Sequence, residues 1–270
     1  MTKLFVSDLD GTLYKIGDQM AAGLSVENHL MVERFRQQGH VFAVATARTT
    51  DHVADIRKTL GFAVDVIGCN GAFLALQDQS VIKYPLQMKY YRSIDKYLRE
   101  RQIDATLTAT FGNERYFYSN NICYPWNTND AVAKERLALK IGINTTLEEY
   151  SDQEECLKLM ILIHPAVMEE VKKELRYLYG EELEIVSSDL DNIDIVQKGC
   201  SKGSAVLRLA EQYGIAKEQI YSVGDSENDI AMFQISNKSY AMSHADASVK
   251  KAATYEVGAV YEALEAVCSE

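Results

Sequence analysis

Two short apolar runs, residues 4–7 and 220–224, stop abruptly at acidic side chains. The acidic residues are Asp8 and Asp10 after the first run, and Asp225 and Asp229 after the second. Such runs are typical of buried strands in a parallel sheet, and open α/β sheets bind ligands at the carboxyl ends of their strands. If the two strands are neighbours, all four carboxylates surround one small volume.

Four carboxylates in one place repel each other unless a cation lies among them. Oxygen ligands without nearby His or Cys suit a hard ion, above all Mg²⁺. Either segment alone is also compatible with an ordinary Asp-Gly turn or a helix cap. A calcium-binding EF-hand loop is excluded for the first segment, because Leu13, Tyr14 and Ile16 stand where that loop needs oxygen ligands.

Two further segments have features of a phosphate site. The apolar run 41–45 ends in Thr46-Ala47-Arg48, just before a predicted helix at 51–60. A hydroxyl and main-chain amides at such a junction can hold a phosphate group. Lys202 opens another predicted helix, where it is either a solvated surface lysine or a positive charge that balances phosphate and the Asp cluster.

Composition narrows the class of protein. The net charge of −11 argues against a nucleic-acid partner, which would need a basic surface. No apolar run approaches the length of a membrane span, and no charged leader precedes the first strand, so we expect no membrane partner. The five Cys are scattered without paired spacing and suggest reduced thiols. We therefore expect a cytoplasmic location.

The order of predicted elements indicates two domains. Strands and helices alternate from residue 4 to 69, followed by a hairpin at 73–84, as a doubly wound parallel sheet requires. Between residues 84 and 195 strands and helices are grouped, which favours an inserted α+β domain. We predict an α/β protein with a Rossmann-like core at 1–83 and 196–270 and an α+β insert at 84–195.

Five segments together resemble the haloacid dehalogenase (HAD) superfamily of aspartyl-phosphate phosphatases, and most closely its Cof-type subfamily. They are DLDGTL at 8–13, ATAR at 45–48, CNGA at 69–72, KGCSKG at 198–203 and GDSENDIAMF at 224–233. The first and last are specific when they occur together. One departure is Ala47, where the family usually has Gly; the main-chain amide survives that change.

The resemblance implies roles for these residues. Asp8 is the expected nucleophile and Asp10 the general acid and base. Mg²⁺ is expected to bind Asp8, the main-chain carbonyl of Asp10, and Asp225. Asp229 is expected to lie next to these ligands and to orient Lys202 or a metal-bound water. The residues expected to bind the phosphate or the substrate are Leu9, Thr46, Ala47, Asn70, Lys202 and Asn228. The insert resembles a type 2 cap.

The expected partner is a small phosphorylated metabolite, such as a sugar phosphate or a cofactor phosphate, and the expected assembly a monomer or homodimer. Aromatic residues at 116–118 and 124–126 either stack on the substrate or pack the cap core. A phosphomutase and a non-catalytic phospho-ligand sensor remain alternatives. Arg48 is expected in a structural ion pair and His164 in the core, while His244 carries no spacing signal.

Overall fold

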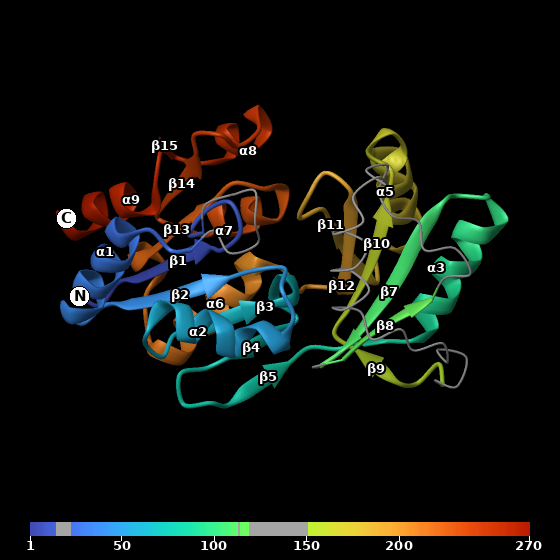
Figure 1. Ribbon diagram of the computed structural model, residues 1–270, viewed down its shortest axis with the longest axis horizontal. Coiled ribbons are helices and arrows are strands. Elements are labelled where there is room, and N and C mark those ends of the chain that lie inside the picture. Colours follow the sequence, from blue (N-terminus) through green and yellow to red (C-terminus); the bar gives the residue numbers. More distant parts are fainter. Residues whose placement is uncertain (15–22, 113, 119–150) are drawn as a thin grey trace. The chain divides into compact units, whose positions relative to one another are not determined.

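The computed structural model describes residues 1–14, 23–112, 114–118 and 151–270, with only the backbone of 114–118. The chain forms two compact units (Figure 1). The core unit comprises Met1–Ile82 and Cys200–Glu270, and the inserted unit comprises Lys83–Gly199. The chain therefore leaves the core unit once and returns to it once.

A mostly parallel sheet runs through the core unit. Its strands are ordered β15-β14-β13-β1-β2-β3-β4-β5. Their bounds are β1 Leu4–Asp8, β2 Val41–Ala45, β3 Asp65–Gly68, β4 Phe73–Ala75, β5 Val81–Lys83, β13 Ile220–Gly224, β14 Lys238–Met242 and β15 Tyr255–Val257. β1 lies between β13 and β2, parallel to both, and Phe5 is opposite Tyr221 and Phe42. The expected pairing of β1 with β13, the two strands that are followed by acidic residues, is confirmed.

Helices cover this sheet and begin where the sequence supplies caps. They are α1 Val26–Gln37, α2 Val53–Leu60, α6 Lys202–Tyr213, α7 Ile230–Phe233, α8 Ala247–Ala252 and α9 Val260–Cys268. The Ser25 side chain accepts a hydrogen bond from the Asn28 amide in the first turn of α1, and Ser201 forms a capping box with Ser204 at the start of α6. The Phe5 ring stacks on Phe42, so the centre of the sheet is packed with aromatic side chains.

The inserted unit has its own antiparallel sheet, ordered β11-β12-β10-β7-β8. Its elements are β6 Leu86–Gln87, α3 Lys89–Glu100, β7 Ala105–Phe111, β8 Glu114–Tyr118, β9 Glu155–Cys156, β10 Lys158–Ile163, α5 Pro165–Tyr179, β11 Leu183–Val186 and β12 Asn192–Gln197. Alternate strand residues such as Leu159, Ile161 and Ile195 form one apolar cluster with Ile94 of α3 and Leu175 of α5. Because strand side chains alternate between faces, the intervening residues lie on the opposite face.

That opposite face carries a buried ion pair. Lys158 Nζ lies 2.8 Å from Asp194 Oδ1, and the two side chains are 5% and 0% exposed. Ser188 donates a hydrogen bond of 2.7 Å to the other Asp194 oxygen. Each charge depends on its partners, because an isolated buried charge is far costlier than a paired one.

Replacing Lys158 with Met is therefore expected to destabilise the protein by about 3–5 kcal/mol, since Asp194 stays buried without its cation. The double variant Lys158→Met/Asp194→Asn removes both charges and should recover much of that loss. Urea unfolding measures both free energies. Equal stability of the single variant and the native protein would show that the pair contributes nothing.

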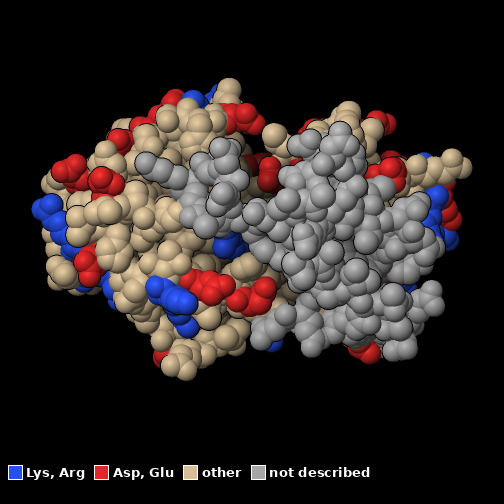
Figure 2. Space-filling view, in the orientation of Figure 1, with Lys and Arg blue, Asp and Glu red and all other residues tan. Residues whose placement is uncertain are grey.

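Charged residues of both signs share the surface. The chain has 39 acidic and 28 basic residues, and on the face in Figure 2 both kinds occur in small groups between uncharged residues. Exposed pairs such as Arg92 with Asp152 contribute little to stability. Within the described ranges, no helix combines the length and apolar character needed to cross a membrane.

The predicted α/β class with an inserted α+β domain is confirmed, with local differences. The helix expected from residue 51 begins as a 3₁₀ turn at Thr50–His52, and α8, β6 and β9 were not predicted. His164 is not a core residue, since its exposed ring caps α5 and its Nδ1 accepts a hydrogen bond from the Ala166 amide. The sequence pattern also predicts a helix at 131–141, but this segment and the aromatic residues at 124–126 lie outside the described residues, as do the side chains of 116–118.

Candidate active site

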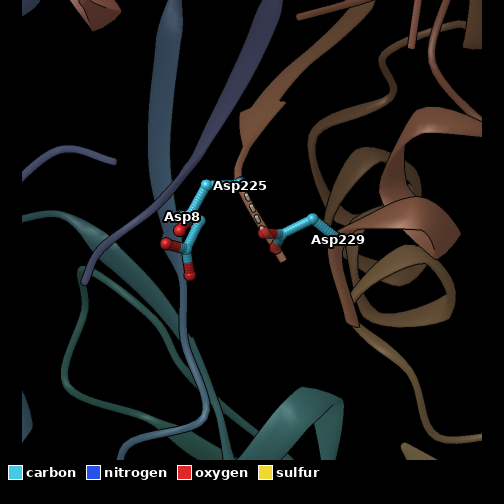
Figure 3. Close-up of side chains that lie close together, drawn as sticks. All are labelled: Asp8, Asp225 and Asp229. Atoms are coloured by element: carbon cyan, nitrogen blue, oxygen red, sulfur yellow. Dashed lines mark hydrogen bonds between the residues drawn. The ribbon is translucent and has the colours of Figure 1, made fainter. Parts of the chain in front are cut away.

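Three carboxylates meet at the carboxyl ends of β1 and β13. Asp8 is the last residue of β1, and Asp225 directly follows β13. Oxygens of Asp8, Asp225 and Asp229 all lie within 4.8 Å of one another (Figure 3). The turn after β1 approaches closely because Gly11 has a φ of +85° and a Cβ there would lie 2.7 Å from Asp225 Oδ2. Only glycine fits at that position.

Lys202 supplies a buried positive charge at this cluster. Its Nζ donates to Asp8 Oδ1 at 2.6 Å and to Asp229 Oδ1 at 2.7 Å, and its side chain is 1% exposed. Lys202 is thus a buried bridge and not a solvated surface lysine. Burial alone would lower the pKa of Lys202, but Asp229 and Asp8 together raise it. The ammonium therefore stays charged.

Asp229 holds the cluster together through hydrogen bonds. Its Oδ1 accepts from Lys202, while its Oδ2 accepts from the main-chain amides of Asp225 and Ser226 at 2.9 and 3.0 Å. Figure 3 shows the bond between Asp225 and Asp229. These bonds fix the turn that presents Asp225. Both oxygens of Asp229 already serve protein donors, so Asp8 and Asp225 are the better placed of the three to bind a ligand.

The electrostatics of the cluster favour a further cation. Burial raises the pKa of Asp8 well above its usual range, and the charges of Asp229 and Asp225 raise it further although Lys202 opposes them. Burial and Asp229 also raise the pKa of Asp225, against the hydrogen bond that Thr12 donates to it. One lysine does not balance three carboxylates, and the donors are all oxygens. This set fits a hard divalent metal ion.

Asp10 does not join that cluster. Its two oxygens accept from Arg48, at 2.8 Å from Nε and 2.5 Å from Nη2, and its side chain is 54% exposed. The ion pair expected for Arg48 is confirmed. Bidentate pairing holds the Asp10 carboxylate in a defined orientation in the turn after β1.

The turns after β2 and β3 are tied together. Thr46 is buried, its hydroxyl oxygen accepts from the Arg48 amide at 3.1 Å, and its carbonyl accepts from the Asn70 amide. Ala47 lies between Thr46 and Arg48 in this turn. Leu9 is fully buried, and its carbonyl accepts a hydrogen bond from Tyr14. The main chain is thus rigidly held where the phosphate-binding residues were predicted.

The buried side-chain carboxamides of Asn70 and Asn228 link the end of β3 to the carboxylate cluster. Asn228 Nδ2 donates to Asn70 Oδ1 at 2.9 Å, and the two residues are 5% and 2% exposed. Asn70 was predicted to contact the substrate, and in the structure its side-chain oxygen accepts a hydrogen bond from Asn228. The structure therefore brings together residues from all five sequence motifs.

The sequence did not indicate a role for His244, because a lone histidine has no spacing signal. Its Nε2 lies 3.6 Å from Asp225 Oδ2, on the loop that follows β14. With Gly11 and Thr12 it lines a cavity of about 410 Å³ in the core unit. Its place just after a strand of the parallel sheet was the signal that could have identified it.

A parallel sheet of this order, with buried carboxylates and a lysine at its strand ends, defines a hydrolase core of the HAD type. Comparison with protein families confirms this assignment. A family model described as haloacid dehalogenase-like hydrolase matches residues 5–267, and the chain belongs to that family. The resemblance drawn from the five motifs is therefore confirmed.

The relatives are phosphatases. The chain is 28% identical to phosphatase YwpJ of Bacillus subtilis, over 93% of both chains. It is 25% identical to the 5-amino-6-(5-phospho-D-ribitylamino)uracil phosphatase YwtE of the same organism, over 94% of this chain and 92% of the relative. The solved structure of the HAD subclass IIB sugar phosphatase BT4131 matches 98% of each chain with a TM-score of 0.79 at 19% identity. The protein is thus a HAD-type phosphatase of the Cof-type subclass.

Proposed function

We propose that this protein hydrolyses small phosphomonoesters, a sugar phosphate or a cofactor phosphate, with Mg²⁺ and through an aspartyl phosphate on Asp8. The observation that carries the proposal is the buried Asp8 carboxylate, whose Oδ1 is held by Lys202 within 4.8 Å of Asp225 and Asp229 oxygens. A buried, oriented carboxylate beside a fixed cation suits nucleophilic attack on phosphorus.

In the first step an Asp8 oxygen bonds to phosphorus as the ester P–O bond breaks, and Asp10 gives its proton to the leaving oxygen. In the second step Asp10 takes a proton from water, which attacks phosphorus and breaks the bond to Asp8, releasing phosphate. Arg48 holds both oxygens of the Asp10 carboxylate, so Asp10 must leave this pair and take up a proton from solvent before it acts as the acid. The proton that it takes from water in the second step restores the acid. Arg48 thus sets the starting position of the acid.

Asp8, the main-chain carbonyl of Asp10 and Asp225 would hold the metal ion. When bound, Mg²⁺ neutralises charge on the transferring oxygens. The residues proposed to hold the phosphoryl group are Leu9 and Ala47 through their amides, Thr46, Lys202, Asn228 and, through Asn228, Asn70. Lys202 is already fixed on Asp8, so its charge needs no rearrangement.

The substrate class rests on the relatives. The names of YwtE and BT4131 describe phosphatases of 5-amino-6-(5-phospho-D-ribitylamino)uracil and of sugars, and we propose a substrate of similar size. We further propose that residues 84–195 act as the cap that selects it. Phosphate release from a panel of phosphorylated metabolites, with Mg²⁺ and with EDTA, tests this. Transfer of phosphate between sugar hydroxyls without release would favour a phosphomutase, and binding without turnover a sensor.

Replacing Asp225 with Ala is expected to raise the Mg²⁺ concentration for half-maximal activity by more than about 10-fold. Even mutation of a residue that only hydrogen-bonds to a metal ligand commonly weakens metal binding by about that factor. Asp246→Ala removes an exposed carboxylate and serves as the matched control. The stabilisation of the folded protein by Mg²⁺, measured by thermal unfolding, should shrink in parallel. An unchanged Mg²⁺ dependence would remove Asp225 from the proposed ligands.

A further inference from the structure

The turn after β3 has an unusual backbone. Cys69, Asn70 and Gly71 have φ angles of 47°, 54° and 98°, all in the left-handed region. Glycine adopts this region freely and Asn tolerates it, but Cys does so at a cost. Hydrogen bonds from the Cys69 amide to the Arg48 carbonyl and from the Asn70 amide to the Thr46 carbonyl hold the turn in place. Such strain persists only where the surroundings enforce it.

This backbone aims the Asn70 side chain at Asn228. Asn228 belongs to the 3₁₀ turn Glu227–Asp229 that follows β13, and its Nδ2 donates to Asn70 Oδ1 at 2.9 Å. Asn228 Oδ1 is buried and has no hydrogen-bond partner among the residues that the structure describes. An unpaired buried acceptor costs free energy, and a donor that arrives with a ligand removes that cost.

We infer that Asn70 is a positioning residue that acts on the substrate only through Asn228. A carboxamide can turn by 180° and exchange its donor and acceptor, and the Asn70 oxygen prevents this because it accepts from nitrogen alone. The second N–H of Asn228 is then kept for a phosphoryl oxygen, and its Oδ1 for a water that accompanies the phosphoryl group. The inference rests on the proposed phosphatase function and assigns Asn70 a role within it.

A double-mutant cycle tests the inference. Asn70→Gly keeps the left-handed backbone but removes the acceptor, and should lower kcat/KM by about 10- to 100-fold, the loss expected when a hydrogen bond to a charged group is lost. Asn228→Ala should have at least as large an effect. In the Asn228→Ala background, Asn70→Gly should change kcat/KM less than twofold, because its only route of action is gone. The affinity for inorganic phosphate with Mg²⁺, measured by calorimetry, should follow the same pattern.

The matched control is Cys69→Gly, which loosens the same turn but leaves the amide pair intact and should keep kcat/KM near the native value. Equal losses in Cys69→Gly and Asn70→Gly would overturn the inference, as would losses that multiply in the double variant. A native-like Asn228→Ala also overturns it, while the phosphatase proposal is judged separately by Asp8. If Asn70→Gly folds poorly, Asn70→Ser, whose hydroxyl is too short to reach Asn228, replaces it in the cycle.

Discussion

Replacing Asp8 with Asn is expected to lower phosphate release by at least about 1,000-fold, because an amide does not form the acyl phosphate. The fold should survive. The pKa of Asp8 is raised by burial and by two neighbouring carboxylates, so the charged form is disfavoured and a neutral amide of the same shape removes that penalty. The measurement is Mg²⁺-dependent phosphate release by a purified sample with native circular dichroism.

Thermal unfolding in EDTA is the control for Asp8→Asn, and its midpoint should not fall. Acid quenching during turnover should trap a phosphoenzyme in the native protein and none in the variant. Phosphate release near the native rate by a folded Asp8→Asn sample would refute Asp8 as the nucleophile and with it the proposed mechanism.

Replacing Lys202 with Met should abolish activity and cost about 3–5 kcal/mol of stability near neutral pH, as when one partner of a buried ion pair is removed. Asp8 and Asp229 would then lie buried beside Asp225 without a fixed cation. Adding Asp229→Asn to the variant should restore part of the stability but not the activity. Urea unfolding in EDTA measures the free energies without interference from metal.

The loss in Lys202→Met should depend on pH. The pKa of Asp8 is raised in the folded state, so above about pH 4, the usual carboxyl value, this group binds more protons in the folded than in the unfolded protein. The contribution of Asp8 to stability then falls as pH rises toward the raised pKa, and it falls more steeply without Lys202. The deficit should be small near pH 4 and larger at neutral pH. A deficit that stays constant over this range would show that lost packing, and not charge, causes it.

The sequence predicted those parts of the site that depend on regular structure. Asp8 and Asp225 follow apolar runs that are typical of buried strands, and the pairing of β1 with β13 brings them together. The capped helix at residue 202 likewise placed a lysine at a helix start. Hydrophobic periodicity, together with the rule that ligands bind at the carboxyl ends of parallel strands, was enough to predict the carboxylates and the lysine.

What the sequence did not predict depends on side-chain direction in turns. The double use of Asp229 as acceptor for Lys202 and for two amides follows from a 3₁₀ turn whose geometry has no sequence period. The left-handed conformation of Asn70 and the approach of His244 to Asp225 arise from tertiary packing. Short elements such as β6 and β9 are equally invisible, because two residues carry no pattern.

The position of β1 between β2 and β13 determines when the site can exist. A growing chain has both β1 and β2 after its first 45 residues, but β13 begins only at Ile220. The inserted unit, which ends at Gly199, can close its own antiparallel sheet before that point. The strand that carries Asp8 therefore keeps one edge unpaired until the chain is nearly complete, and a shorter chain leaves that edge open to pairing with other molecules. Truncation before β13 thus removes Asp225 and Asp229 from the cluster and creates a surface that favours aggregation.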